Sequence, residues 1–347
     1  MIPITTRTQH CFLVSILYLA CLLLTDAGGS VLAAETMKIK LATVAPKGSV
    51  YHRVLQEMGT AWQDAQGNDA RFLIYPDGSQ GSEANTVRRM RIGQLDAAML
   101  SVAGLKEIDE SVTALQFMPL MFRSWEEFDY VHDHVRSELE QKLLDKGFVV
   151  LFWGEGGWVQ FFSTTPRLTP EDYRTARIFQ WAGTPAQVDM MKSLDYHPVV
   201  LELSDILTSL QTGMIDVVPV APMWALAFQL YGKTTHMLRM NWVPIVGATV
   251  ITTRSWNAMR PEARDALRRA GARAGTTLRT HRDVQDENTI KAMQSRGLTV
   301  HQPTPQMEQQ WQEITRGMWP SIRGSMVPAD KFDQVVRLLS EYRTRQP

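Results

Sequence analysis

The sequence predicts a two-lobed α/β fold with one long helix spanning both lobes. Three observations predict it: strand-like and helix-like segments alternate from residue 37 onward, glycines interrupt the chain at Gly154–Gly157, and residues 260–295 form a single helical pattern. Such alternation is typical of mostly parallel sheets flanked by helices. A helix of this length exceeds the usual globular range, which suits it to span two domains.

The first 34 residues have the pattern of a secretory signal peptide. Arg7 precedes an apolar run from Cys11 to Leu24, and small residues ending in Val31-Leu-Ala33 follow. A basic start, a short apolar core and a small-residue end are typical of such peptides, whereas a membrane span needs about 20 apolar residues. We therefore expect cleavage after Ala33 or Ala34 and an exported protein.

Segments before the glycines alternate between strands and helices. Strands are expected at Met37–Thr43, Arg71–Tyr75, Leu95–Leu100 and Gly147–Trp153. The last is a continuous apolar run, which indicates a strand buried on both faces. Helices are expected after the caps Ser49 and Ser82, and from the capping box Ser124-Trp-Glu-Glu127 to about Lys146.

Strand-like segments recur after the glycines, where we place the first crossover between domains. They are Val159–Ser163, Ala176–Trp181, His197–Leu201, Ile215–Val220, Gly247–Thr253 and Gly297–His301. Thr169-Pro170 with Asp172 predicts a capped helical turn before the second of them, and Thr304-Pro305 starts the closing helices. We expect residues 35–157 and 247–285 in lobe I, and residues 158–246 and 286–347 in lobe II.

Composition argues against several classes of function. The formal net charge is zero, so no basic excess favours nucleic acid or anionic lipid surfaces. Cys11 and Cys21 are the only cysteines and lie in the predicted signal peptide, which leaves no thiol for a disulfide, a metal site or a nucleophile. After residue 34 no apolar run approaches the length of a membrane span.

The sequence shows no combination of residues that indicates a catalytic, metal or cofactor site. His132 and His134 are two apart on a predicted helix, so their rings face different directions and cannot share a metal ion. Gly154-Glu-Gly156-Gly157 lacks the further glycine of a dinucleotide fingerprint, which favours a hinge. No Gly-x-Ser-x-Gly occurs, and Glu155 alone is not a catalytic pair. We predict a protein that is not an enzyme and has no catalytic residues, cofactor or metal.

Several motifs together resemble the solute-binding proteins of tripartite ATP-independent periplasmic (TRAP) transporters. They are Lys38-Ile-Lys-Leu-Ala-Thr43 with Pro46-Lys-Gly-Ser49, Ser79-Gln-Gly81, Gly93-Gln-Leu-Asp96, Met118-Pro-Leu-Met-Phe122, Pro170-Glu-Asp172 and Leu210-Gln-Thr-Gly213-Met-Ile-Asp216. The resemblance implies a periplasmic-binding-protein fold that closes on a ligand between its lobes. It also implies a periplasmic receptor that docks on a small and a large membrane permease subunit.

The sequence differs from the family pattern at the positions that bind the ligand. The arginine with which the family holds a carboxylate falls on Phe179, a second one falls near Val159 or Gln160, and a polar contact falls in the apolar stretch Val218–Pro222. A carboxylate buried without its charged partner costs on the order of several kcal/mol. A neutral amide returns only about 1 kcal/mol. Organic acids are therefore expected to bind poorly in the usual way.

Aromatic side chains crowd this region and predict a hydrophobic or amphipathic ligand, including a lipid-like one. Three or four such contacts, worth about 1.5–3 kcal/mol each, would give micromolar affinity without an ion pair. Glutamine amides and indole N–H groups would orient the polar end. The predicted ligand-binding residues are Trp158, Gln160, Phe161, Phe179, Gln180, Trp181, Val220, Trp224 and Trp242.

Three alternatives stay open at this point. Tryptophans such as Trp224 and Trp242 could belong to the core. A basic side chain elsewhere, Lys47, Arg88 or Arg254, could replace the missing arginine and restore binding of organic acids. The same fold could also serve an exported sensor or scaffold that passes the ligand to a partner other than a permease.

Overall fold

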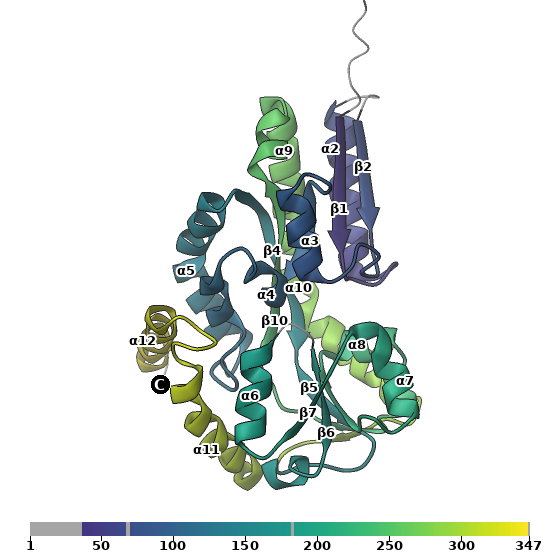
Figure 1. Ribbon diagram of the computed structural model, residues 1–347, viewed down its shortest axis with the longest axis vertical. Coiled ribbons are helices and arrows are strands. Elements are labelled where there is room, and N and C mark those ends of the chain that lie inside the picture. The colour runs from purple at the N-terminus through teal and green to yellow at the C-terminus, as the bar shows by residue number, and fades with distance from the viewer. Residues whose placement is uncertain (1–36, 67–69, 182–183, 346–347) are drawn as a thin grey trace, which may run out of the picture. The chain divides into compact units, whose positions relative to one another are not determined.

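A computed structural model describes residues 37–66, 70–181 and 184–345, with two sheets and the helices around them (Figure 1). The predicted signal peptide lies outside these residues. Apart from Met37, the described residues belong to one compact unit, Lys38–Pro347. Within the described part of the chain, no helix has both the length and the apolar character that crossing a membrane requires.

The first sheet has five strands in the order β2-β1-β3-β10-β4. They are β1 (Met37–Thr43), β2 (Ala70–Tyr75), β3 (Ala97–Ser101), β4 (Phe148–Trp158) and β10 (Pro244–Thr252). β1 and β3 run parallel, and β10 lies antiparallel between β3 and β4. The helices α2 (Val50–Gln66), α3 (Glu83–Arg91), α4 (Val102–Leu105), α5 (Trp125–Asp145) and α9 (Thr253–Ala258) accompany this sheet.

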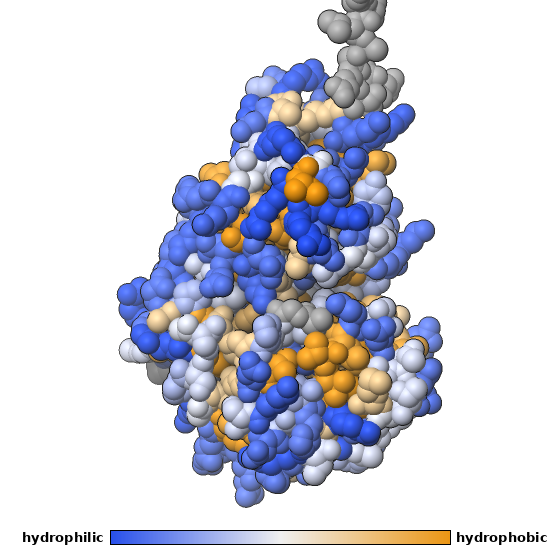
Figure 2. All heavy atoms as spheres, in the orientation of Figure 1, coloured by the Kyte–Doolittle hydropathy of each residue, from blue (hydrophilic) through white to orange (hydrophobic). Residues whose placement is uncertain are grey.

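The second sheet has six strands in the order β11-β9-β5-β8-β6-β7. They are β5 (Gln160–Ser163), β6 (Arg177–Trp181), β7 (His197–Leu201), β8 (Val217–Val220), β9 (His236–Leu238) and β11 (Thr299–His301). The helices α6 (Pro185–Ser193), α7 (Ile206–Gln211), α8 (Pro222–Ala227) and α11 (Pro305–Ile322) accompany it. Apolar atoms gather on the outer face over this sheet (Figure 2), and Val200 of β7 is half exposed.

Two connections join the sheets side by side. Val159 alone separates β4 from β5, and residues 239–243 separate β9 from β10. The Val159 N–H donates to the Val243 carbonyl at 2.9 Å, and the Trp242 N–H donates to the Val159 carbonyl at 3.1 Å. The predicted two-lobed α/β fold is therefore confirmed, while the residue bounds of each lobe stay a prediction.

The glycines at the predicted crossover lie inside a strand, which differs from the expectation that the strand ends at Trp153. β4 continues through them to Trp158 because β10 pairs with it along this length, with Gly154 opposite Gly247. Tight packing also requires glycine there, since a Cβ on Gly156 would lie 2.6 Å from the Ile245 side chain.

The long helix α10 (Pro261–Gln294) confirms the single helix predicted for residues 260–295. It packs against α2 and β4 of the first sheet and against α8 beside the second. Gly271 and Gly275 bring α10 close to β4. A Cβ on Gly271 would lie 2.9 Å from the Leu151 carbonyl oxygen. The last helix, α12 (Ala329–Arg345), packs against α5, although our prediction placed residues 286–347 in the other lobe.

Local capping follows the sequence closely. The 3-10 turn η2 (Pro170–Tyr173) starts with the predicted capping box, and Asp172 also accepts the Leu168 N–H at 2.8 Å. Ser124 accepts the Glu127 N–H at the start of α5. The Glu127 carboxylate, however, accepts the N–H of Arg123 rather than that of Ser124, so this predicted box forms in part.

Candidate functional site

A cavity of about 180 Å³ lies beside the connections between the two sheets. β6 supplies four of its lining residues, Ile178 to Trp181, and the connections supply Val159, Trp242 and Val243. The remaining lining residues come from the segment around Gln116, from the helices α4, α6 and α11, from the strands β5, β8 and β10, and from turns and loops next to these elements. No described residue that lines the cavity carries a charge.

Five of the nine predicted ligand residues line this cavity: Phe161, Phe179, Gln180, Trp181 and Trp242. The other four lie elsewhere. Trp158 and Gln160 line a cavity of about 260 Å³ beside α5 and α10. Trp224 lines a small cavity of about 70 Å³ next to β10, and Val220 packs in the core of the second sheet.

Phe179, at the position of the family's arginine, is buried with 5% of its surface exposed. It lies in the middle of β6, opposite Val199 of β7. Its ring belongs to the second sheet's core, with Phe162 and Ile206, and also borders the cavity. The side chain is thus part of the cavity wall rather than a group that projects freely into it.

Two glutamine amides at the cavity have one end held by the protein. The Gln180 Nε2 donates to the Thr184 hydroxyl at 2.8 Å, and that hydroxyl donates to the Trp181 carbonyl at 2.9 Å. The Gln116 Oε1 accepts the Val246 N–H at 3.1 Å. Among the described residues, neither Gln180 Oε1 nor Gln116 Nε2 has a hydrogen-bond partner.

Gln160, by contrast, uses both ends of its amide within the connections. Its Oε1 accepts the Met240 N–H at 2.6 Å, and its Nε2 donates to Asn241 at 3.1 Å. The side chain is 3% exposed. Its geometry links β5 to the segment before β10.

Two aromatic residues that were not predicted from the sequence, Tyr173 and Trp311, also line the cavity. Phe161 contacts Tyr173, Trp242 and Trp311, with ring centroids 5.1, 5.2 and 5.6 Å apart. Burial raises the pKa of the Tyr173 hydroxyl, which donates to the Arg167 carbonyl and stays neutral. Trp311 and Met318 lie seven residues apart on α11, and that helical spacing was the one local signal for them.

The basic residues that could replace the family's arginine lie outside the cavity lining. Lys47, Arg88 and Arg254 do not line the cavity. Arg88 instead borders a polar hollow beside Arg89 and Gln80. The described residues contain no group of three or more His, Cys, Asp or Glu side chains arranged to hold a metal ion.

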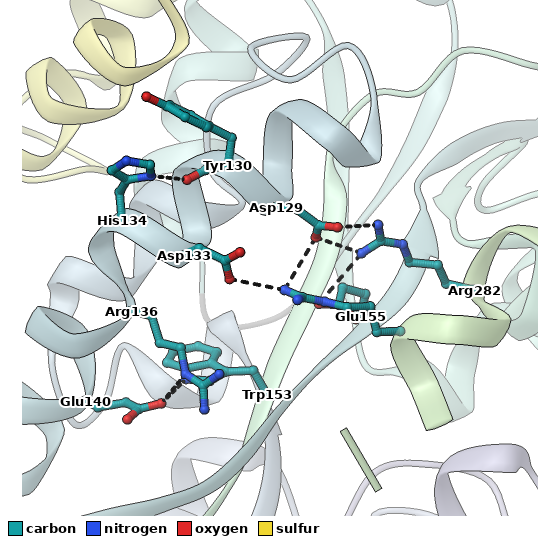
Figure 3. Close-up of polar contacts among 10 residues, drawn as sticks. Asp129, Tyr130, Asp133, His134, Arg136, Glu140, Trp153, Glu155 and Arg282 are labelled. Atoms are coloured by element: carbon teal, nitrogen blue, oxygen red, sulfur yellow. Dashed lines mark hydrogen bonds and ion pairs between the residues drawn. The ribbon is translucent and has the colours of Figure 1, made fainter. Parts of the chain in front are cut away.

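A cluster of charged side chains joins α5, β4 and α10 and does not line the cavity (Figure 3). Arg282 of α10 hydrogen-bonds Asp129 of α5, and its guanidinium is also 3.9 Å from Glu155 of β4. Burial raises the pKa of Glu155, which is 3% exposed, although Arg282 and Arg279 oppose that shift. Glu155 therefore belongs to the contact between β4 and α10 and does not line the aromatic cavity.

Comparisons with known proteins agree on one family. The family described as "Bacterial extracellular solute-binding protein, family 7" matches residues 41–324. Protein YiiZ of Salmonella typhimurium is 27% identical over 165 residues, 47% of this chain and half of that protein. The C4-dicarboxylate-binding periplasmic protein DctP of Rhodobacter capsulatus is 20% identical over 243 residues, 70% of this chain and 73% of that one.

A solved structure shares the fold. A TRAP periplasmic solute-binding protein of Shewanella oneidensis, with bound succinate, superimposes with a TM-score of 0.80 at 15% identity. The similarity covers 87% of this chain and 99% of that one.

Proposed function

The chain belongs to bacterial extracellular solute-binding protein family 7, the receptors of TRAP transporters, and we propose that its cargo is neutral and largely apolar. Family members are binding receptors rather than enzymes. The cargo of this receptor would be hydrophobic or amphipathic, and would lie in the cavity bordered by Phe179.

The observation that carries this proposal is the absence of charge among the described lining residues. An ionised carboxylate placed there would lose its hydration without gaining a guanidinium or ammonium partner. Apolar contact, in contrast, is worth about 25 cal/mol per Å² of buried surface. Aromatic rings such as Phe161, Trp181 and Trp242 supply such surface on several sides.

Delivery of the cargo to membrane permease subunits completes the proposed role, since TRAP receptors work with such subunits. The predicted signal peptide supports a periplasmic location after cleavage. Closure of the lobes on the cargo would favour docking because only the closed form offers contacts from both lobes to the ligand.

Organic acids are the second candidate cargo. The relatives favour them: the Rhodobacter protein is named for C4-dicarboxylates, and the Shewanella structure holds succinate. Acid binding here would need a cation to enter the cavity. The three candidates Lys47, Arg88 and Arg254 do not line it, which favours the neutral cargo.

Mass spectrometry of material extracted from the natively purified receptor tests the proposal. A co-purified neutral compound, together with no thermal stabilisation by succinate, is the expected result. A dicarboxylate as the only compound that is both extracted and able to restabilise the stripped receptor would refute the neutral cargo.

A further inference from the structure

The volume of the cavity gives a second guide to the cargo, beside its apolar lining. At about 180 Å³ it is slightly larger than an apolar protein cavity of about 150 Å³ that holds benzene. It is smaller than the roughly 300–1,000 Å³ of pockets for drug-sized ligands. A single ring with one small substituent matches this volume.

The wall of the cavity suits a flat ring. Phe161 sits at the centre of an aromatic cluster with Tyr173, Trp242 and Trp311. Methionines from α6, α11 and the segment after it complete the lining: Met190, Met191, Met318 and Met326. Aromatic edges and faces pair favourably with another ring, and thioether sulfurs make favourable contacts with ring edges.

The hydrogen bonds of Thr184 fix how Gln180 presents its amide. A hydroxyl has one proton to donate, and that of Thr184 goes to the Trp181 carbonyl. Thr184 can then only accept from Gln180, so it takes the amide NH₂. The Gln180 carbonyl oxygen Oε1 is left as a hydrogen-bond acceptor at the cavity.

The Val246 N–H fixes Gln116 in the opposite sense. A backbone N–H can only donate, so it holds the Gln116 oxygen Oε1. The Gln116 NH₂ is left as a donor at the cavity. These two segments therefore offer a neutral acceptor and a neutral donor, in addition to the Gln187 amide and the Trp181 and Trp242 indoles of the same lining.

From the cavity's size, aromatic wall and paired amide groups, we infer that the cargo is a small single-ring aromatic molecule with one neutral group that both donates and accepts hydrogen bonds. A primary amide, a lactam or a phenol meets this description. Gln180 accepts from that group and Gln116 donates to it. The inference rests on the proposed neutral cargo and narrows it from hydrophobic molecules in general to a single-ring molecule.

Isothermal titration calorimetry with the full receptor tests the inference with three probes of similar size. Benzamide carries a ring and a neutral donor–acceptor group, benzoate is its charged isostere, and toluene has the ring alone. Benzamide should bind most tightly and benzoate at least about tenfold more weakly, since its charge finds no partner. Toluene should bind weakly, through apolar contact only.

Two substitutions separate the amide contacts from packing. Gln180→Leu and Gln116→Leu should each weaken benzamide binding about fivefold, the typical effect of one lost hydrogen bond, and should not weaken toluene binding, because leucine makes the wall more apolar. Gln309→Leu, the same change at an exposed position of α11, is the control and should alter neither. Toluene binding at least as tight as that of the parent also shows that each variant is folded.

The outcomes separate this inference from the proposed function. If dodecanol binds and benzamide does not, the ring-sized cargo is wrong and the neutral receptor stands. If benzoate or succinate binds more tightly than benzamide, both fail. If benzamide binds but neither glutamine variant weakens it, the assigned amide contacts are wrong, and with them the donor–acceptor group.

Discussion

Arg282 of α10 and Asp129 of α5 form a two-pronged contact, with both guanidinium NH₂ nitrogens on the two carboxylate oxygens at 2.9 and 2.7 Å. Arg282 also stacks on Trp125, 4.4 Å from its ring centroid, and its side chain is 9% exposed. The long helix is thereby fastened to α5 across the edge strand β4, as Figure 3 shows for Arg282, Asp129 and Glu155.

Removal of this guanidinium should destabilise the fold. Arg282→Met removes the bidentate partner of Asp129 and leaves Arg279, 3.5 Å from Asp129 and 4.0 Å from the buried Glu155, as their shared cation. We therefore expect the free energy of unfolding to fall by about 3 kcal/mol. Urea denaturation followed by circular dichroism measures it. Arg268→Met breaks an exposed pair with Asp265 and should cost less than about 1 kcal/mol. Equal losses in both variants would contradict a special role for the buried pair.

Phe179→Arg should convert the ligand preference. A guanidinium at this position restores the charged partner that an organic acid needs, so the variant should gain calorimetrically detectable succinate binding that the parent lacks. Phe179→Leu keeps the site apolar and is the matched control, with no such gain. Succinate binding by the parent as tight as by the arginine variant would mean that another cation already serves the cavity.

His132 should make the fold sensitive to acid. Burial, followed by the nearby charges of Arg279 and Arg136, lowers the pKa of His132 from 6.5 to about 4. The neutral ring is thus favoured in the folded protein. Its stabilising effect is complete above pH 6.5 and is lost as the pH falls from there toward 4. The shift corresponds to a loss of about 3 kcal/mol below pH 4.

Substitution of this histidine isolates its effect from that of the acidic groups. Both ring nitrogens lack hydrogen-bond partners among the described residues, and the ring stacks on Phe128. His132→Phe should therefore keep the packing and unfold at similar urea concentrations at pH 7.5. Between pH 6.5 and 4.5 it should lose less stability than the parent. Parallel pH profiles for the two proteins would rule out His132 as the cause.

Glycines in two helices should respond oppositely to alanine. A Cβ at Gly271 of α10 would lie 2.9 Å from the Leu151 carbonyl oxygen. Gly271→Ala therefore forces the helix away from β4 and should lower the free energy of unfolding by about 1–3 kcal/mol. Gly317 of α11 has nothing within 4 Å, so Gly317→Ala should add up to about 1 kcal/mol through helix propensity. Thermal unfolding measures both. A stabilised Gly271→Ala variant would show that the close packing is not limiting.

Features governed by local rules could be predicted from the sequence. Thr169, Pro170 and Asp172 form the expected capping box because their hydrogen bonds connect neighbours. The start of α10 at Pro261 follows from the fixed φ of proline at a first helical position. Phe161 and Trp242 lie at one cavity, but only the family resemblance, not periodicity, indicated that their segments meet.

Features that depend on contacts between residues far apart in the sequence could not be predicted from it. Gln160 is held by Asn241, 81 residues away, and no local pattern predicts that contact. The strand through Gly154 and Gly156 exists because β10 pairs with it, whereas glycines by themselves indicate a break. Trp311 reaches the cavity from the closing helices, whose packing depends on the assembled second sheet.

The position of β10 between β3 and β4 has a consequence for biosynthesis. A polypeptide that emerges amino end first cannot finish its first sheet until Thr252 has appeared, since β10, which lies between β3 and β4, is the last of the five strands in the sequence. Until then β3 and β4 present unpaired edges, and such long-range pairing folds slowly. This delay would keep the newly made chain unfolded, so that it could pass through a translocation pore. It would also make the chain dependent on chaperones until it has passed.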